Sequence, residues 1–139
     1  MRALIVYSKQ GNVEQLAKGL SDVLKKGNCQ VQLMEADANG AGPISGAPYD
    51  LVILGSPTLG FFGGEMGDDL VAVSSRLTRL EGKTAAAFVA SKLFGTAKSL
   101  KAVMALLEKQ GAMVQDFAAL QGQADVERFG QRLLKLLGR

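Results

Sequence analysis

Histidine and tryptophan are absent from this chain of 139 residues, and cysteine occurs once. Without histidine the chain lacks the commonest general base, the base of Ser-His and Cys-His nucleophile pairs, and the commonest transition-metal ligand. No closely spaced cluster of Asp or Glu stands at the end of a predicted strand either. We therefore expect no catalytic residue and no metal site, and we expect any chemistry to be carried by a bound group.

The single cysteine, the mixed charge and the short apolar runs exclude further classes. Cys29 cannot form an intramolecular disulfide, and we expect it to be a small buried apolar residue. The 16 Lys and Arg are interleaved with 13 Asp and Glu, so the net charge of +3 forms no basic stripe and predicts no nucleic-acid partner. No apolar stretch approaches about 20 residues, so we expect no membrane span and, from the short apolar start, no signal peptide. These features predict one cytoplasmic domain over residues 1–139.

The most informative local pattern lies at residues 2–24, where an apolar run gives way to a glycine-containing loop and then to an amphipathic helix. The run Ala3-Leu4-Ile5-Val6-Tyr7 predicts a buried strand, and apolar residues recur at helical spacing from Val13 to Leu24. At such a junction the loop amides and the first helix amides have no backbone partner, and the helix dipole adds partial positive charge. We therefore expect a phosphate or similar anion at residues 8–13. The alternative is a loop without a ligand, because Ser, Gly and Asn are also ordinary turn and cap residues.

Strand and helix patterns alternate along the rest of the chain. Residues 29–33 predict an edge strand with one polar face, 36–48 a loop, 51–54 a strand covered on both faces, 84–90 another buried strand and 112–117 a weaker one. Three further helices are expected. The first buries Met66, Leu70, Val73 and Leu77; the second buries Leu100, Val103, Met104 and Leu107 and ends at Gly111; the third, near 124–137, buries Val126, Phe129, Leu133, Leu136 and Leu137.

This alternation predicts an α/β fold with a parallel sheet and helices on both faces, joined by right-handed crossovers. About five strands in 139 residues favour a doubly wound five-stranded parallel sheet of order 2-1-3-4-5 in a three-layer sandwich. The ligand crevice of that topology opens between the first and third strands. We therefore expect the loops at 8–13, 56–64 and 91–96 to meet at one rim of the sheet.

Two segments resemble the short-chain flavodoxin family, and the resemblance covers essentially the whole chain. Ser8 and Gly11 match the family's phosphate-loop pattern Ser/Thr-x-Thr-Gly-x-Thr, with Gln10 and Val13 in place of two hydroxyls. The segment Tyr49-Asp50-Leu51-Val52-Ile53-Leu54-Gly55-Ser56-Pro57-Thr58 is close to the family's pattern before its first flavin-contacting loop.

The resemblance implies FMN as cofactor and assigns its contacts to three loops. The implied cofactor-binding residues are Ser8, Lys9, Gln10, Gly11, Asn12, Val13, Ser56, Pro57, Thr58, Leu59, Gly60, Phe61, Phe62, Ser91, Lys92, Leu93, Phe94 and Gly95. Family members flank the flavin ring with aromatic side chains, for which this chain offers Phe61 or Phe62 and Phe94. The two missing hydroxyls predict weaker phosphate binding unless Lys9 or the Gln10 side chain substitutes, because a hydrogen bond to a charged group contributes about 1.5–3 kcal/mol.

Three functions are compatible with this resemblance. The first is an FMN-binding electron-transfer protein of the flavodoxin type, which passes electrons to a redox partner protein and supplies no catalytic base. The second is a small flavin-dependent reductase acting on a quinone or similar acceptor, and the third is a flavodoxin-like interaction module that has lost FMN. A phosphorelay receiver of the same topology is excluded, because it needs a phosphorylatable Asp where this chain has Gly55-Ser56.

Charges flank the expected rim unevenly. Three lysines lie in or after the third loop, with no acidic residue from 91 to 101: Lys92, Lys98 and Lys101. Three acidic residues follow the second loop: Glu65, Asp68 and Asp69. The sequence thus predicts a mouth with a basic and an acidic side, or helix ends that are simply solvated.

Overall fold

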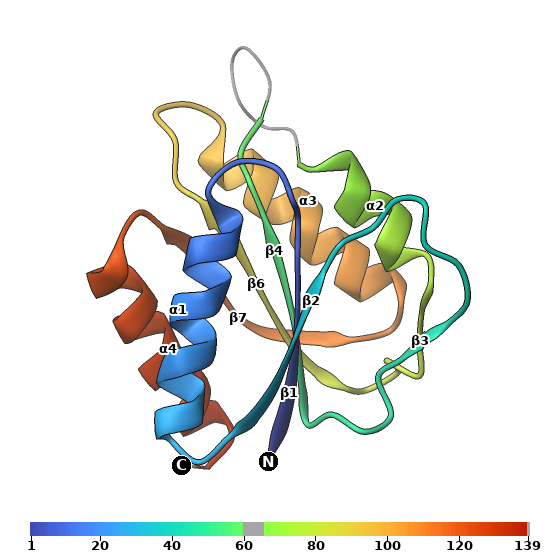
Figure 1. The fold of residues 1–139 in the computed structure, drawn as a ribbon, viewed down its shortest axis with the longest axis horizontal. Helices are drawn as coiled ribbons and strands as arrows, with labels where there is room; N and C mark the ends of the chain where they lie inside the picture. Colours follow the sequence, from blue (N-terminus) through green and yellow to red (C-terminus); the bar gives the residue numbers. More distant parts are fainter. Residues whose placement is uncertain (60–65, 139) are drawn as a thin grey trace.

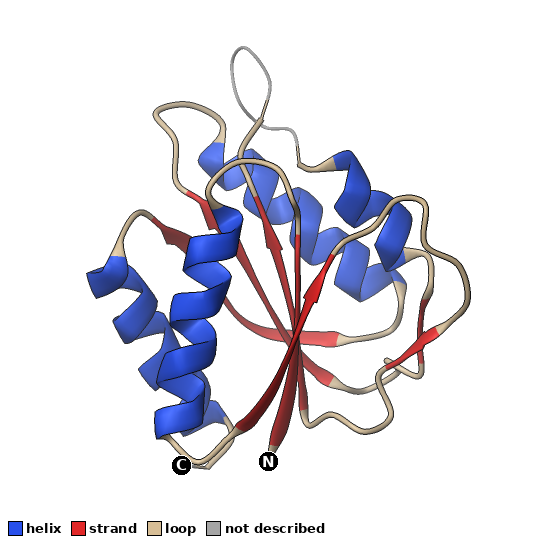
Figure 2. Cartoon of the chain, viewed as in Figure 1, coloured by secondary structure: helices blue, strands red, loops and turns tan. Residues whose placement is uncertain are grey.

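The computed structural model describes residues 1–59 and 66–138, in which strands and helices alternate (Figure 1). The main strands are β1 (Arg2–Tyr7), β2 (Gln30–Glu35), β4 (Leu51–Ser56), β6 (Thr84–Ala90) and β7 (Met113–Leu120). The helices are α1 (Val13–Lys26), α2 (Asp68–Ser74), α3 (Thr96–Lys109) and α4 (Gln123–Leu136). Figure 2 shows the sheet between two helical layers, with α1 and α4 on one face and α2 and α3 on the other.

The sheet has the predicted topology. Its strand order is β2-β1-β4-β6-β7, and all neighbouring strands run parallel. Numbered by position along the chain, these five strands have the order 2-1-3-4-5, so the predicted doubly wound sheet is confirmed. Because all five strands are parallel, their carboxyl ends share one edge of the sheet. The strand order reverses between β1 and β4, where a ligand crevice opens in this topology.

Burial explains the apolar sequence of the central strands. Every residue of β4 is buried, because helices cover both faces of the sheet. On the face covered by α1 and α4, the rings of Phe88 and Phe129 pack edge to face with centroids 6.5 Å apart. Cys29 is buried, as predicted. Edge strand β2 alternates exposed and partly buried residues over its first half, in agreement with its polar pattern.

Two short strands were not predicted. β3 (Ile44–Ser45) and β5 (Leu77–Thr78) form a separate two-stranded parallel sheet, within segments assigned from the sequence to a loop and to a helix. The helix containing Leu70 and Val73 is correspondingly shorter than predicted, since Leu77 pairs with Ile44 instead of continuing α2. Leu77 is nevertheless buried, so the expected burial is right and the expected helix is wrong at this residue.

The C-terminal elements differ in detail from the sequence prediction. β7 extends to Leu120, three residues beyond the predicted strand. Near the end of α4, Leu134 is buried. Leu136, which the sequence places in the core, is 39% exposed. None of the helices in the described part of the chain is long and apolar enough to cross a membrane.

Candidate functional site

The loops that follow β1, β4 and β6 lie at the same edge of the sheet, at the top of Figure 1. The first two are in close approach, because a Cβ atom built at Gly11 would lie 3.1 Å from Cβ of Pro57. The second loop is joined to the end of β6, where the third loop begins, by a hydrogen bond of 2.9 Å from the Thr58 hydroxyl to the backbone oxygen of Ala90. The described parts of these loops therefore meet, as the sequence predicts.

The first loop presents backbone donors at the start of α1. Gly11 has a φ of +67°, which glycine adopts without strain, and Asn12 is the N-cap but makes no side-chain cap hydrogen bond. Among the described residues, the N–H groups of Gly11 and Asn12 have no hydrogen-bond partner. These two amides and the free N–H groups of the first turn are the donors that an anion needs.

Three residues of this loop are not placed to contact an anion in the way that the sequence suggests. Lys9 points toward β2, where its Nζ lies 3.8 Å from Oε1 of Glu35. The Gln10 backbone N–H, expected to contact the anion, instead donates to Oγ of Ser8 at 3.1 Å. The Val13 side chain is fully buried in the core beneath α1, so this residue can offer only its amide.

A carboxylate from α2 accepts hydrogen bonds from two other donors of the first loop, the Ser8 hydroxyl and the Lys9 N–H. Oδ1 of Asp69 accepts a hydrogen bond of 2.7 Å from the Ser8 hydroxyl, and Oδ2 accepts one of 2.8 Å from the Lys9 N–H. Both side chains are buried, with exposed fractions of 0% for Ser8 and 9% for Asp69. Asp69 is therefore not part of a solvated acidic rim, and the predicted acidic side is wrong for this residue, whereas Asp68 is exposed.

The second loop is tied down where the structure describes it. The buried Ser56 hydroxyl donates to the backbone oxygen of Pro57 and accepts from the Gly67 N–H, at 2.8 and 3.0 Å. Pro57 and Thr58 are buried, and Leu59 is partly exposed. Three predicted contacts, Gly60, Phe61 and Phe62, lie outside the described residues, as does Glu65.

The third loop is ordered around Thr96 and exposes two apolar side chains. The Thr96 hydroxyl accepts from the Lys92 N–H at 3.0 Å and donates to the Lys92 carbonyl at 2.8 Å. Leu93 and Phe94 are 86% and 63% exposed, and Gly95 follows them with a left-handed φ of +80°. This loop therefore holds a pair of apolar side chains in solvent at the rim.

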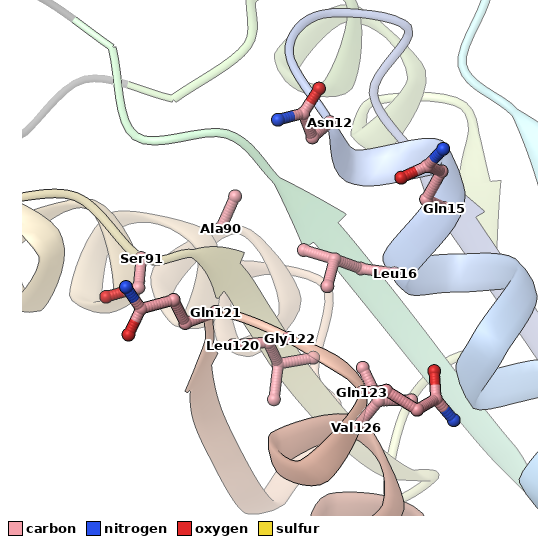
Figure 3. Close-up of a pocket in the computed structure, with 10 residues that line it drawn as sticks. All are labelled: Asn12, Gln15, Leu16, Ala90, Ser91, Leu120, Gln121, Gly122, Gln123 and Val126. Carbon is pink, nitrogen blue, oxygen red and sulfur yellow. The ribbon is translucent and has the colours of Figure 1, made fainter.

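A cavity of about 330 Å³ lies beside the rim, between α1 and the β7–α4 connection (Figure 3). Neutral amide and hydroxyl groups dominate its polar lining, with the N-cap Asn12 and with Gln15 of α1 facing Ser91 and Gln121 across the space. Sequence reasoning included Asn12 and Ser91 and missed the other two. No sequence signal marks them, because exposed glutamines are common on any surface.

Two ionisable groups close to the rim have shifted pKa values. Burial, followed by the charges of Glu14 and Glu35, raises the pKa of Tyr7 at the end of β1. The backbone N–H of Gln121, which donates to the carboxylate at 2.8 Å, lowers the pKa of Asp125. Neither group is a general base near neutral pH, because Tyr7 is protonated and Asp125 is a weak base.

The rim fits the phosphate of FMN through its backbone and not through its hydroxyl. The amides of Gly11 and Asn12, which have no partner among the described residues, match an anion, whereas the Ser8 hydroxyl already donates its hydrogen bond to Asp69. Within residues 1–59 and 66–138, no group of three or more His, Cys, Asp or Glu side chains could hold a metal ion.

At the level of sequence, no protein-family model and no curated protein matches this chain. Solved structures do match it. Flavodoxin 1 from Bacillus cereus shares 22% identity, with a TM-score of 0.75 over 100% of this chain and 99% of that one. A mutant form of flavodoxin from Pseudomonas aeruginosa shares 15% identity, with a TM-score of 0.76 over 100% of both chains. A flavodoxin from Streptococcus pneumoniae TIGR4 shares 20% identity, with a TM-score of 0.73 over 98% of this chain and 99% of that one. The chain therefore has a flavodoxin-like fold.

Proposed function

We propose that residues 1–139 form one domain that binds FMN at the rim of the three loops and carries electrons to and from a redox partner protein. The observation that carries this proposal is the convergence of the loops near the amides of Gly11 and Asn12, which have no partner among residues 1–59 and 66–138. The proteins of similar structure named above are flavodoxins, which supports the same function by analogy of fold.

Each part of the rim has a role in this proposal. Bound FMN supplies the redox chemistry, because it accepts and releases electrons. The start of α1 holds the phosphate through backbone N–H groups, while the second and third loops enclose the ring. The bond from Thr58 to Ala90 keeps those two loops in register. Phe94 offers an aromatic face to the ring from the third loop.

A titration with FMN tests this function. We expect purified protein to quench FMN fluorescence saturably, to alter its visible absorption spectrum and to retain the flavin on a desalting column. Absence of any such binding would overturn the proposal. An interaction module without flavin would then explain the fold best, with the exposed side chains of Leu93 and Phe94 as its contact surface.

Two glycines provide a matched test of where FMN binds. Gly11 and Gly82 both have a left-handed φ, of +67° and +72°, so an alanine at either position costs about 1–2 kcal/mol of strain. Only Gly11 lies at the rim, where its new Cβ would approach Pro57, whereas the space around Gly82 is open. Gly11→Ala should therefore weaken FMN binding, and Gly82→Ala should leave the dissociation constant unchanged. Equal affinities in both variants would place the flavin elsewhere.

The basic side of the rim gives a prediction on redox potential. Lys92, Lys98 and Lys101 are exposed in or after the third loop, and a positive charge near the ring favours the reduced flavin. We expect Lys92→Gln to lower the potential by up to about 40 mV at low ionic strength, the size of one solvent-exposed Coulomb contact. The effect should shrink as salt is added.

Lys109→Gln is the control for this measurement, because Lys109 lies in the last turn of α3, far along the helix from the rim. Its redox titration should reproduce the wild-type potential. If Lys92→Gln also does so, the Lys92 charge points away from the flavin, and the basic side has its role in contact with an acidic partner protein.

A further inference from the structure

The Asp69 carboxylate lies where the first loop would otherwise turn its donors toward a phosphate. It accepts the Ser8 hydroxyl through one oxygen and the Lys9 N–H through the other, at 2.7 and 2.8 Å. The N–H of Leu70 also donates to Oδ1, at 2.8 Å. Gly67 permits this approach, since a Cβ there would lie 2.5 Å from Oγ of Ser8. A buried carboxylate is therefore part of the loop's hydrogen-bond network.

The Ser8 hydroxyl has no capacity left for a phosphate oxygen in this arrangement. A serine hydroxyl carries one proton, and that proton is donated to Asp69. The same oxygen accepts the Gln10 N–H at 3.1 Å. Phosphate oxygens of a bound dianion can only accept hydrogen bonds, so Ser8 can serve such a ligand only if Asp69 releases it.

The charge of Asp69 also disfavours a phosphate at the first loop. None of the ion pairs in the described part of the chain includes Asp69, so hydrogen bonds and its place in the first turn of α2 compensate its carboxylate. At 9% exposure this charge is screened weakly by solvent and salt. A phosphate dianion at the neighbouring amides of Gly11 and Asn12 would be repelled by it, whereas an uncharged hydroxyl group would not.

We propose that Asp69 determines how strongly this rim distinguishes a phosphorylated flavin from an unphosphorylated one, and that it nearly abolishes the distinction. The wild-type protein then binds FMN and riboflavin with dissociation constants within about tenfold of each other. The reason is that repulsion from Asp69 offsets most of the binding free energy that the phosphate gains from the backbone amides. This inference rests on the proposed flavin-binding function and specifies which chemical form of the flavin the site accepts.

Fluorescence titrations with FMN and with riboflavin test the inference through the ratio of the two dissociation constants. Asp69→Asn removes the charge and keeps a side-chain oxygen that can accept from Ser8, so the loss of repulsion should let FMN bind about tenfold more tightly while riboflavin affinity stays the same. Asp68→Asn is the matched control, because it removes the same charge from an exposed neighbour in the first turn of α2. Its ratio should equal that of the wild-type protein.

Ser8→Ala supplies a second test, and its first arm uses the wild-type background alone. If the Ser8 hydroxyl stays hydrogen-bonded to Asp69, Ser8→Ala in the wild-type background should leave the FMN dissociation constant within about twofold of the wild-type value. In an Asp69→Ala background, where no side-chain oxygen at position 69 accepts the Ser8 proton, the hydroxyl is free for the phosphate, and Ser8→Ala should then weaken FMN binding. Thermal unfolding of each variant in the absence of flavin verifies that it is folded.

The outcomes separate this inference from the proposed function. A strong wild-type preference for FMN that Asp69→Asn leaves unchanged would overturn the inference and leave the flavin function standing. A large loss of FMN affinity in Ser8→Ala alone would do the same, because it would show that the hydroxyl contacts the phosphate. Failure of both flavins to bind would overturn the function and the inference together.

Discussion

Replacing Phe88 with alanine is expected to lower the free energy of unfolding by about 3–5 kcal/mol. The Phe88 side chain is fully buried in β6, and its ring packs against Phe129 of α4 at an interplanar angle of 66°. Removal of the ring would leave a cavity between the sheet and α4 that rigid strands cannot close. Since domains of this size are stable by only about 5–15 kcal/mol, the variant would be close to unfolding at moderate temperature.

Urea unfolding measures this loss, and Phe117→Ala is its control. Phe117 lies on the neighbouring strand β7 with its side chain 51% exposed, so its removal should change stability by no more than about 0.5 kcal/mol. A loss below about 1 kcal/mol for Phe88→Ala, at an unchanged denaturant dependence, would contradict the packing described here.

Gly55 extends the same test to the strand that carries the second loop. Gly55 pairs with Phe88 between β4 and β6, and a Cβ at Gly55 would overlap the Phe88 ring. Gly55→Ala alone should therefore destabilise the protein by about 1–3 kcal/mol, through overpacking. In the Phe88→Ala background the added methyl group enters the vacated space, so the double variant should lose less than the sum of the two single losses.

The main sheet could be predicted because its burial is recorded in short sequence runs. The segment from Leu51 to Leu54 has no polar residue, which fits a strand covered on both faces, and the structure buries all of it. The strand order followed from the regular alternation of elements and from the handedness of crossover connections. These signals are local, and tertiary contacts do not override them.

The sequence prediction of secondary structure fails where a helix and a strand would bury the same residues. Val73 and Leu77 have helical spacing and are both buried, but Leu77 pairs with Ile44 in a small separate sheet. Periodicity reports which residues face the core and cannot tell whether the chain turns back between them. Leu134 and Leu136 differ for a similar reason, because both lie near the boundary of the apolar face of α4.

The candidate site was predicted as a set of loops and not as a set of contacts. Ser8 and Gly11 marked the first loop, yet its polar partner, Asp69, comes from 61 residues beyond Ser8 in the chain. Asp68 and Asp69 are chemically identical neighbours, but successive helical residues point about 100° apart, and Asp69 lies four residues before the buried Val73 on the inward side of α2. Helical spacing can indicate that burial, but it does not identify Ser8 and Lys9 as the partners of Asp69.

Phe94 is an exposed side chain on a loop that hydrogen bonds hold in place, so its contribution to FMN binding can be tested by substitution. Phe94→Ser is expected to weaken FMN binding by about 10- to 100-fold, because a stacked ring contributes both buried apolar area and aromatic contact. The stability of the flavin-free protein should change by no more than about 0.5 kcal/mol, since Phe94 is 63% exposed. Fluorescence titration and urea unfolding of the same preparation measure the two quantities.

Two further variants make this result specific to the rim. Phe94→Tyr retains an aromatic face and should keep FMN affinity within about threefold of wild type. Phe117→Ser removes an aromatic side chain that is similarly exposed, at 51%, from the edge strand β7, and should leave FMN binding unchanged. If Phe94→Ser binds FMN as tightly as the wild-type protein does, Phe94 does not cover the flavin. The exposed pair Leu93 and Phe94, held by an ordered loop, would then be the first place to test for contact with a partner protein.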